Sequence, residues 1–292
     1  MLSVLTNRTY GHLFAAQVIA LVGTGLATVA LGLLAYEIAG TDAGAVLGTA
    51  LAIKMVAYIG IAPVVGAYAD RLPRKTLLVA MDVVRAVVAM ALPFVDAVWQ
   101  IYLLIFLLQS ASAAFTPTFQ ATIPDILPDE EEYTTALSLS RLAYDLESLL
   151  SPILAAALLT VINFHWLFAG TSVGFIISAM LVVTSALPHR QAAKKIVESV
   201  WRKTTRGARI YLRTPRLVGL LAVTLAAAAG SAMVIVNTVV IVKGMGRSQE
   251  DVALALAAYG GGSMLAALIL PRALRSISDR SVMIAGAFLL TA

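Results

Sequence analysis

Charged side chains that interrupt long apolar runs are the residues of this sequence best placed to do chemistry. Asp82 and Arg85 lie three positions apart, and Arg141 and Asp145 lie four positions apart. At these spacings two side chains share one face of a helix, so that an acid can neutralise a base. Charges inside a membrane are costly and mark structural or functional sites. We expect the Asp82–Arg85 pair to be structural.

Glu147 and Lys54 have no such neighbour in the sequence. Glu147 follows Asp145 by two residues and therefore points to a different face of its helix. A carboxylate in a medium of low dielectric favours its protonated form and can exchange a proton when water reaches it, whereas a lone lysine can bind an anionic group. Together with Gln109 and the Arg141–Asp145 pair, these residues are predicted to form a proton and substrate site. Alternatively, Lys54 and Glu147 pair with each other across the bundle.

The sequence offers little for other kinds of chemistry. It contains no cysteine, and its three histidines, His12, His165 and His189, are far apart. A Gly-x-x-x-x-Gly-Lys-Ser/Thr element for binding ATP phosphates is absent from the sequence. No nucleophile–base pair of an intramembrane enzyme is recognisable. We therefore predict no metal site, no cofactor and no enzyme activity.

The elements that must position these residues are membrane-spanning helices. The chain is 60% hydrophobic and 13% charged, with a mean hydropathy of +0.90, and a spanning helix needs about 20 apolar residues. These numbers predict an all-α polytopic membrane protein. The expected helices are residues 10–36, 44–69, 76–95, 98–119, 134–161, 166–187, 217–242 and 252–274, with a ninth apolar run from 281 and a proline-rich acidic loop at 117–133.

The basic residues predict the orientation of the chain. Arg8, the turn around Arg71 and the segment 189–216 fall on one side of the predicted bundle. Because basic loops stay in the cytoplasm, the N-terminus is expected there and the protein in the cell (inner) membrane. Residues 190–212 alternate basic and apolar positions at helical spacing, which is typical of a helix on the bilayer surface. The net charge of +5 therefore indicates a lipid partner and no nucleic acid.

The turn between the second and third apolar runs carries a recognisable pattern. Gly66, Asp70, Arg71, Arg74 and Lys75 resemble the loop signature Gly-x-x-x-Asp-Arg-x-Gly-Arg-Arg/Lys of the major facilitator superfamily, with Pro73 in place of the usual glycine. The alternative is a basic stop-transfer cluster that happens to contain one aspartate. In that family the motif acts as a gate on the cytoplasmic side.

Further residues resemble one branch of that superfamily, the proton-coupled exporters of drugs and siderophores, such as macrolide and enterobactin exporters. They are Asp82-Val83-Val84-Arg85-Ala86 and the helix prolines Pro63 and Pro152. The glycines that the exporters carry around the second proline are missing, since Ser151 precedes it and alanines follow. Separately, Asp70-Arg71 and Asp279-Arg280 follow apolar runs at nearly corresponding positions, which indicates an internal repeat of two tandem halves.

The resemblance implies a bundle of two tandem halves that work by alternating access. Residues 1–188 would form a six-helix half, 189–216 a basic cytoplasmic linker and 217–292 an incomplete second half. The implied function is proton-coupled efflux of a small amphipathic molecule, with that molecule, protons and the lipid bilayer as partners. Alternatively, the chain is a truncated, non-transporting fragment or one part of a split transporter, whose remaining helices come as a separate chain.

Overall fold

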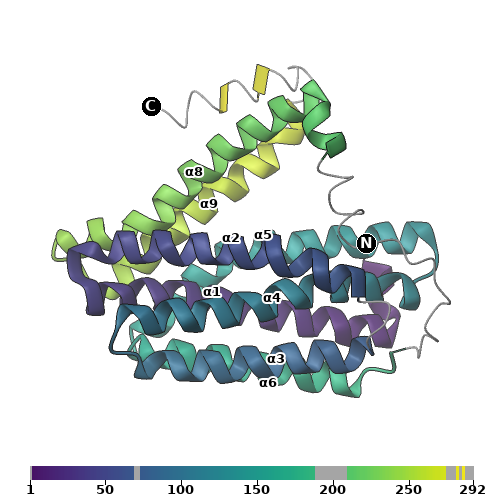
Figure 1. Ribbon diagram of the computed structural model, residues 1–292, viewed down its shortest axis with the longest axis horizontal. Helices are drawn as coiled ribbons and strands as arrows, with labels where there is room; N and C mark the ends of the chain where they lie inside the picture. Colours follow the sequence, from purple (N-terminus) through teal and green to yellow (C-terminus); the bar gives the residue numbers. More distant parts are fainter. Residues whose placement is uncertain (1, 69–72, 188–208, 274–280, 283–284, 287–292) are drawn as a thin grey trace.

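The computed structural model describes residues 2–68, 73–187, 209–273, 281–282 and 285–286. In this part of the chain the regular structure is helical throughout (Figure 1). The long helices are α1 (Arg8–Ala39), α2 (Ala43–Tyr68), α3 (Arg74–Ala91), α4 (Val98–Ile126), α5 (Glu130–Leu159), α6 (His165–Thr184), α8 (Pro215–Gly244) and α9 (Gln249–Ala273). Three short 3₁₀ helices accompany them: η1 (Leu2–Thr6), η2 (Gly40–Asp42) and η3 (Leu92–Phe94).

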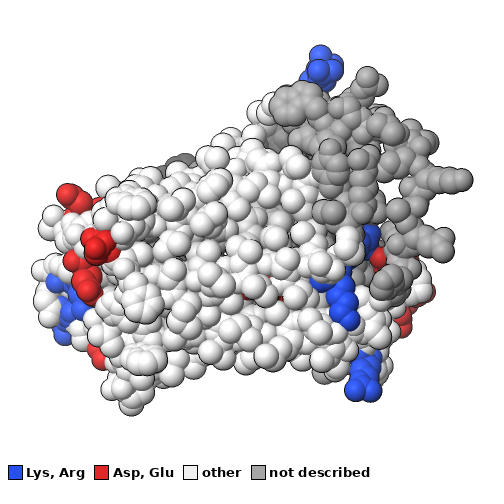
Figure 2. Space-filling view, turned by 60° about the horizontal axis from the view of Figure 1, so that its bottom comes forward, with Lys and Arg blue, Asp and Glu red and all other residues white. Residues whose placement is uncertain are grey.

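Six described segments are long and apolar enough to cross a membrane, and one of them joins α1 and α2 through η2. The others are α3 with η3, α4, α5, α6 and α8. Charged side chains gather at two opposite ends of the molecule, whereas the broad band between them is almost free of charge (Figure 2). The protein is therefore a multi-pass membrane protein, and the predicted all-α class is confirmed.

The helix ends follow local chemistry. The Asn7 side chain accepts hydrogen bonds from the backbone N–H groups of Thr9 and Tyr10 and so caps α1. Asp129 caps α5 in the same way, and the next three residues are glutamates. Negative charge at the start of a helix interacts favourably with the helix dipole. The acidic run that the sequence placed in a loop therefore begins a helix.

Residues 117–133, predicted to be a loop, are mostly helical, and that prediction was wrong. α4 continues to Ile126 with Pro117 and Pro124 inside it, and only the residues before the cap at Asp129 interrupt the helices. A proline inside a helix removes one backbone hydrogen bond and would end most helices in water.

The side chains around these prolines explain why α4 continues. The hydroxyl of Thr118 donates to the carbonyl of Ala114 at 2.9 Å, and Arg74 donates to the carbonyl of Ala121. In membrane helices, neighbouring side chains can satisfy the backbone groups that a proline disturbs. These partners come from the same helix and from α3, so the helix is completed partly by tertiary contacts.

Helices α1–α6 pack around a shared apolar core, with α1 against α6 and α5. Small residues let the backbones approach: Gly23 of α1 lies against Thr171 of α6, whose hydroxyl donates to the Gly23 carbonyl at 2.7 Å. Close packing of this kind is the main attraction between helices in lipid. It fixes the relative positions of the helices that carry the candidate residues.

Helices α8 and α9 lie side by side and touch the other helices mainly at one end (Figure 1). Near the turn between them, Val239 of α8 is buried against Gly32 of α1, and Asn237 lies beside Gly44. Toward Pro215 and Ala273 the two helices lean away from the first six (Figure 1). The bundle is therefore closed at one end and spread apart at the other.

The predicted basic segment 190–212 lies largely outside the described residues. Of this segment, residues 209–212 are described, and they are helical. The short apolar run predicted from 281 onward also falls mostly outside the described part of the chain.

Candidate functional site

A cavity of about 410 Å³ lies among the helices near the middle of the bundle. Its volume falls in the usual range for small-molecule sites. Seven helices contribute to its walls: α1, α2, α3, α4, α5, α8 and α9. The residues that line it include Gly25, Lys54, Tyr58, Arg85, Gln109, Ser112, Phe115, Tyr144, Glu147 and Tyr259.

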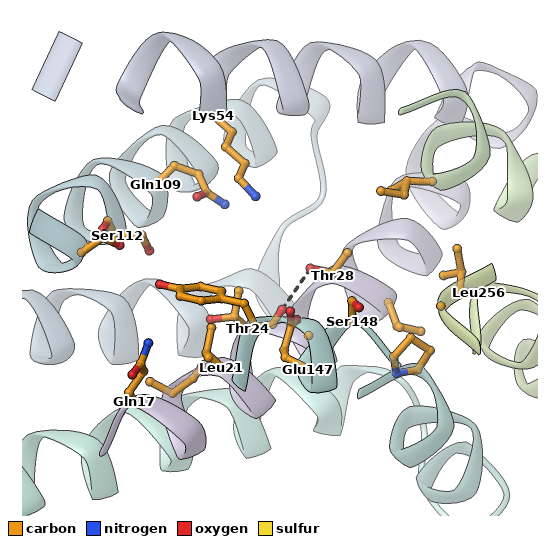
Figure 3. Close-up of a pocket in the computed structure, with 18 of the residues that line it drawn as sticks. Gln17, Leu21, Thr24, Thr28, Lys54, Gln109, Ser112, Glu147, Ser148 and Leu256 are labelled. Carbon is orange, nitrogen blue, oxygen red and sulfur yellow. Dashed lines mark hydrogen bonds between the residues drawn. The ribbon is translucent and has the colours of Figure 1, made fainter. Parts of the chain in front are cut away.

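Lys54 and Glu147, the two unaccompanied charges of the sequence, both point into this cavity (Figure 3). They extend from opposite walls, Lys54 from α2 and Glu147 from α5. The two groups interact electrostatically across the space. Among the described residues, neither charged group has a hydrogen bond or an ion-pair partner within 4.0 Å. The structure thus brings the two residues to one site without joining them directly.

The position of Glu147 depends on a close approach between α5 and α1. Gly25 of α1 lies against Ser151, and a Cβ atom at Gly25 would collide with the Ser151 side chain. The same Cβ would lie 2.7 Å from Oε1 of Glu147. Because only a glycine leaves this space, Gly25 allows the Glu147 carboxylate to lie against α1 at the cavity wall.

Gln109 of α4 lines the same cavity as Lys54, and α4 packs against α2 (Figure 3). Ser112, on the same wall, donates its hydroxyl back to the carbonyl of Leu108 at 3.0 Å. Ser112 is therefore satisfied within its own helix, whereas the amide of Gln109 can form hydrogen bonds with a ligand.

The Asp82–Arg85 pair forms a buried network. Arg85 donates to one oxygen of Asp82, and the Ser178 hydroxyl of α6 donates to the other at 2.7 Å. The guanidinium of Arg85 stacks over the rings of Phe115 and Phe175, with its carbon 4.2 and 4.5 Å from the ring centres. The network ties α3 to α4 and α6, and Arg85 also reaches the cavity wall.

Arg141 and Asp145 pair with each other at 3.4 Å, as their spacing predicts. Their side chains are 79% and 56% exposed, and neither lines the cavity. Asp145 and Glu147 therefore lie on different faces of α5. The structure does not bring the Arg141–Asp145 pair to the candidate site.

The charged turn is described only in part. Gly66 lies in the last turns of α2, and Asp70 and Arg71 lie outside the described residues. Arg74 forms an ion pair with Asp125 near the end of α4. Lys75 donates to the carbonyl of Ser185, just after α6, at 2.9 Å. These contacts tie the start of α3 to the ends of two neighbouring helices.

The aromatic part of the cavity wall was not predicted from the sequence. Tyr58, Phe115, Tyr144 and Tyr259 all line the cavity. Tyr58 follows Lys54 by four residues, and Tyr144 precedes Glu147 by three. Residues at these spacings share a helix face. This spacing relative to the two lone charges is the signal that would have identified both tyrosines.

Among the described residues, no group of three or more His, Asp or Glu side chains could hold a metal ion. The cavity instead combines opposite charges with aromatic surface, which suits reversible binding of an organic molecule.

Comparison with known proteins identifies the family of this bundle. The sequence profile of the Major Facilitator Superfamily matches residues 13–292. The chain belongs to that superfamily. It is therefore a member of a family of membrane transporters, and the resemblance noted in the sequence is confirmed.

Several curated superfamily members are similar to the chain at low identity. The Macrolide efflux protein A of Streptococcus pyogenes is 24% identical over 60% of this chain and 44% of its own length. The same-named protein of Enterococcus faecalis is 25% identical over 49% of the chain and 47% of its own length. The uncharacterized MFS-type transporter YfiS of Bacillus subtilis is 27% identical over 42% of the chain and 30% of its own length. The matches thus span less than half of each relative.

Solved structures of the superfamily share the fold. The nucleoside transporter NupG superposes with a TM-score of 0.70 at 15% identity, over 91% of this chain and 68% of its own. A bacterial homologue of the human lysosomal transporter Spinster, in an inward-facing conformation, gives a TM-score of 0.69 at 14% identity, over 91% and 63% of the two chains. At these identities the similarity shows a facilitator-type bundle and no particular substrate.

Proposed function

We propose that this superfamily member is a proton-coupled exporter that moves a small amphipathic molecule across the cell membrane by alternating access. The observation that carries the proposal is the central cavity, in which Glu147 and Lys54 face each other between aromatic walls. The similarity to proteins named macrolide efflux protein A supports efflux as the direction.

Alternating access requires two groups of helices that rock around one site. We assign residues 1–188 to the first group, 217–292 to the second and 189–216 to a cytoplasmic linker, with the N-terminus in the cytoplasm. The placement of α8 and α9 fits this scheme. The two helices close the bundle near Val239 and diverge from it toward Pro215 (Figure 1). In the proposed orientation this shape is open to the cytoplasm, where an exporter collects its substrate.

Glu147 is the proposed proton-coupling group. A carboxylate at the wall of a water-accessible cavity is ionised when water surrounds it and is neutral when the cavity closes over it. The other titratable or charged groups that line the cavity are Lys54, Arg85, Tyr58, Tyr144 and Tyr259. A proton and the basic group of a substrate would compete for the Glu147 carboxylate, and that competition couples the two flows in opposite directions.

The charged turn is the proposed cytoplasmic gate. Arg74 and Asp125 brace α3 against α4. We propose that Asp70 and Arg71 make the contacts that form and break as the cytoplasmic side closes and opens, in the manner of an ion-paired switch.

The proposed function can be tested with inside-out membrane vesicles from cells that express the protein from its native gene with all of its flanking coding sequence. Uptake of a labelled macrolide is measured after an acid-inside pH gradient is imposed. One pH unit supplies about 1.4 kcal/mol per proton, enough for about tenfold accumulation. Accumulation that collapses when a protonophore is added supports the proposal. Equal uptake with and without the gradient, for a macrolide, for a panel of lipophilic amines and for aromatic zwitterions such as tryptophan, would refute proton-coupled efflux.

A further inference from the structure

The two cavity charges differ in sign and stand on opposite walls. Lys54 comes from α2 and Glu147 from α5, and both point into the same space (Figure 3). Within the described part of the chain, neither has a hydrogen bond or an ion pair within 4.0 Å. Both side chains are partly buried. A partly desolvated charge without a direct partner is costly, so a site of this kind is completed by a ligand that brings the opposite charges.

Arg85, the other charged residue of the wall, does not compete for such a ligand. Asp82 neutralises it directly, and the rings of Phe115 and Phe175 cover its guanidinium. Among the described lining residues, the cation and the anion left for a ligand are therefore Lys54 and Glu147.

Each charge has a tyrosine one helical turn away on its own wall. Tyr58 follows Lys54 on α2, and Tyr144 precedes Glu147 on α5; both tyrosines line the cavity. Phe115 and Tyr259 add aromatic surface from α4 and α9. Such side chains give large apolar contact areas and pack against rings at an offset or edge-on.

We infer that the cavity selects a zwitterionic molecule with an aromatic ring, which places its carboxylate on Lys54, its ammonium group on Glu147 and its ring between the tyrosines. This inference rests on the proposed function, because it names the class of molecule that the same cavity carries. A ligand that lacks one of the two charges leaves a cavity charge desolvated and uncompensated. Sites with buried polar groups reject analogues that lack the matching group much more strongly than apolar pockets do.

The test uses matched compounds that share an indole ring. Tryptophan and the dipeptide tryptophylglycine are zwitterions with two different spacings between the charges. Their C-terminal amides lack the carboxylate, and their N-acetyl derivatives lack the ammonium group. Binding to the purified protein is measured by isothermal titration calorimetry at neutral pH. We expect one of the zwitterions to bind at least about tenfold more tightly than both of its capped forms, a difference of about 1.4 kcal/mol.

Two variants assign the charges. Lys54→Met should remove the preference for the zwitterion over its amide, and Glu147→Gln should remove the preference over the N-acetyl form. Lys243→Met at the end of α8 and Glu37→Gln, which is exposed on α1, are the controls and should keep both preferences. Capped and zwitterionic forms that bind equally at both spacings would overturn the inference. Variants of Lys54 and Glu147 that leave the preferences unchanged would overturn it as well.

The outcome is separable from that of the proposed function. Proton-driven macrolide export without any preference for zwitterions would remove the inference and leave the proposed function standing. Selective zwitterion binding without any proton-driven transport would refute the proposed function and leave the zwitterion preference standing. Binding to Lys54 and Glu147 does not require coupling to a proton.

Discussion

At the scale of single residues, two acids of α5 that are two positions apart have different roles. Asp145 pairs with Arg141 on an exposed face, whereas Glu147 lines the cavity. Successive helical residues are separated by about 100°, which turns these side chains roughly 200° apart. The difference between them is therefore a matter of direction, and it makes Asp145 a natural control for Glu147.

Glu147→Gln should abolish export driven by a pH gradient, because an amide cannot take up and release a proton. The amide is similar in size, so binding of substrate should remain measurable. Asp145→Asn should export at the wild-type rate, since its side chain lies outside the cavity. Transport in vesicles at several imposed pH gradients checks both. Wild-type export by Glu147→Gln, with the usual dependence on the gradient, would show that the proton is carried elsewhere.

Gly25→Ala should disturb the same site sterically. The added Cβ would collide with Ser151 and press on Glu147, so α1 and α5 must move apart. We expect a loss of stability of about 1–3 kcal/mol, as for other overpacked cores, together with slower export. Gly48→Ala on α2 is the control, because its added Cβ meets nothing within 4 Å. Thermal unfolding in detergent measures the first effect, and equal melting temperatures for both variants would contradict the close packing at Gly25.

At the scale of the helices, the polar contacts at the start of α3 join elements that are distant in sequence. Arg74 bonds both to Asp125 and to a backbone carbonyl of α4, and Lys75 bonds to the end of α6. A carbonyl at the end of a helix attracts a cation through the helix dipole. These contacts brace one end of the bundle.

Asp125→Asn should lower the stability of this end by about 1–3 kcal/mol, because it removes the carboxylate that neutralises a largely buried guanidinium. Arg74→Gln alone should cost a similar amount. The double variant should cost less than the sum of the two single variants, since the partners are lost together. Melting temperatures of the four proteins give the interaction energy. Strictly additive effects would mean that the ion pair contributes nothing to stability.

At the scale of the whole molecule, the charged ends and the uncharged band define a membrane-spanning body (Figure 2). The proposed orientation places the turn at η2 outside the cell and the start of α5 in the cytoplasm. The sequence contains no cysteine, so a single introduced cysteine reports its own position. Thr41 and Glu131 are both exposed and lie on the two opposite faces of this scheme.

In intact cells, Thr41→Cys should react with a membrane-impermeant maleimide, and Glu131→Cys should not. Both should react once the cells are permeabilised, which controls for accessibility. The reason is the concentration of basic residues on the side of Arg8 and Arg74. A cysteine at Gln191 is expected to behave like the one at position 131, although that residue lies outside the described part. Labelling of Glu131→Cys in intact cells would reverse the orientation.

The sequence alone determined the features that are local. Long apolar runs predict spanning helices because the backbone must satisfy its own hydrogen bonds in lipid. Spacings of three and four predict the Asp82–Arg85 and Arg141–Asp145 pairs, because the helix itself brings those side chains together. The acidic and proline-rich stretch before α5 was wrongly predicted to be a loop. The Ala121 carbonyl near Pro124 of α4 is bonded by Arg74, which belongs to α3, and the local sequence does not show this contact.

Only the tertiary structure decided which helix faces meet. Spanning helices are apolar on nearly every side, so their periodicity does not reveal which face points inward. Packing at small residues such as Gly25 sets that direction, and it turns Glu147 toward Lys54 while Asp145 stays outside. The cavity, its tyrosines and the approach of two distant charges arise from helices that are far apart in the chain. The sequence names the residues, and the packing of the helices decides which of them share a site.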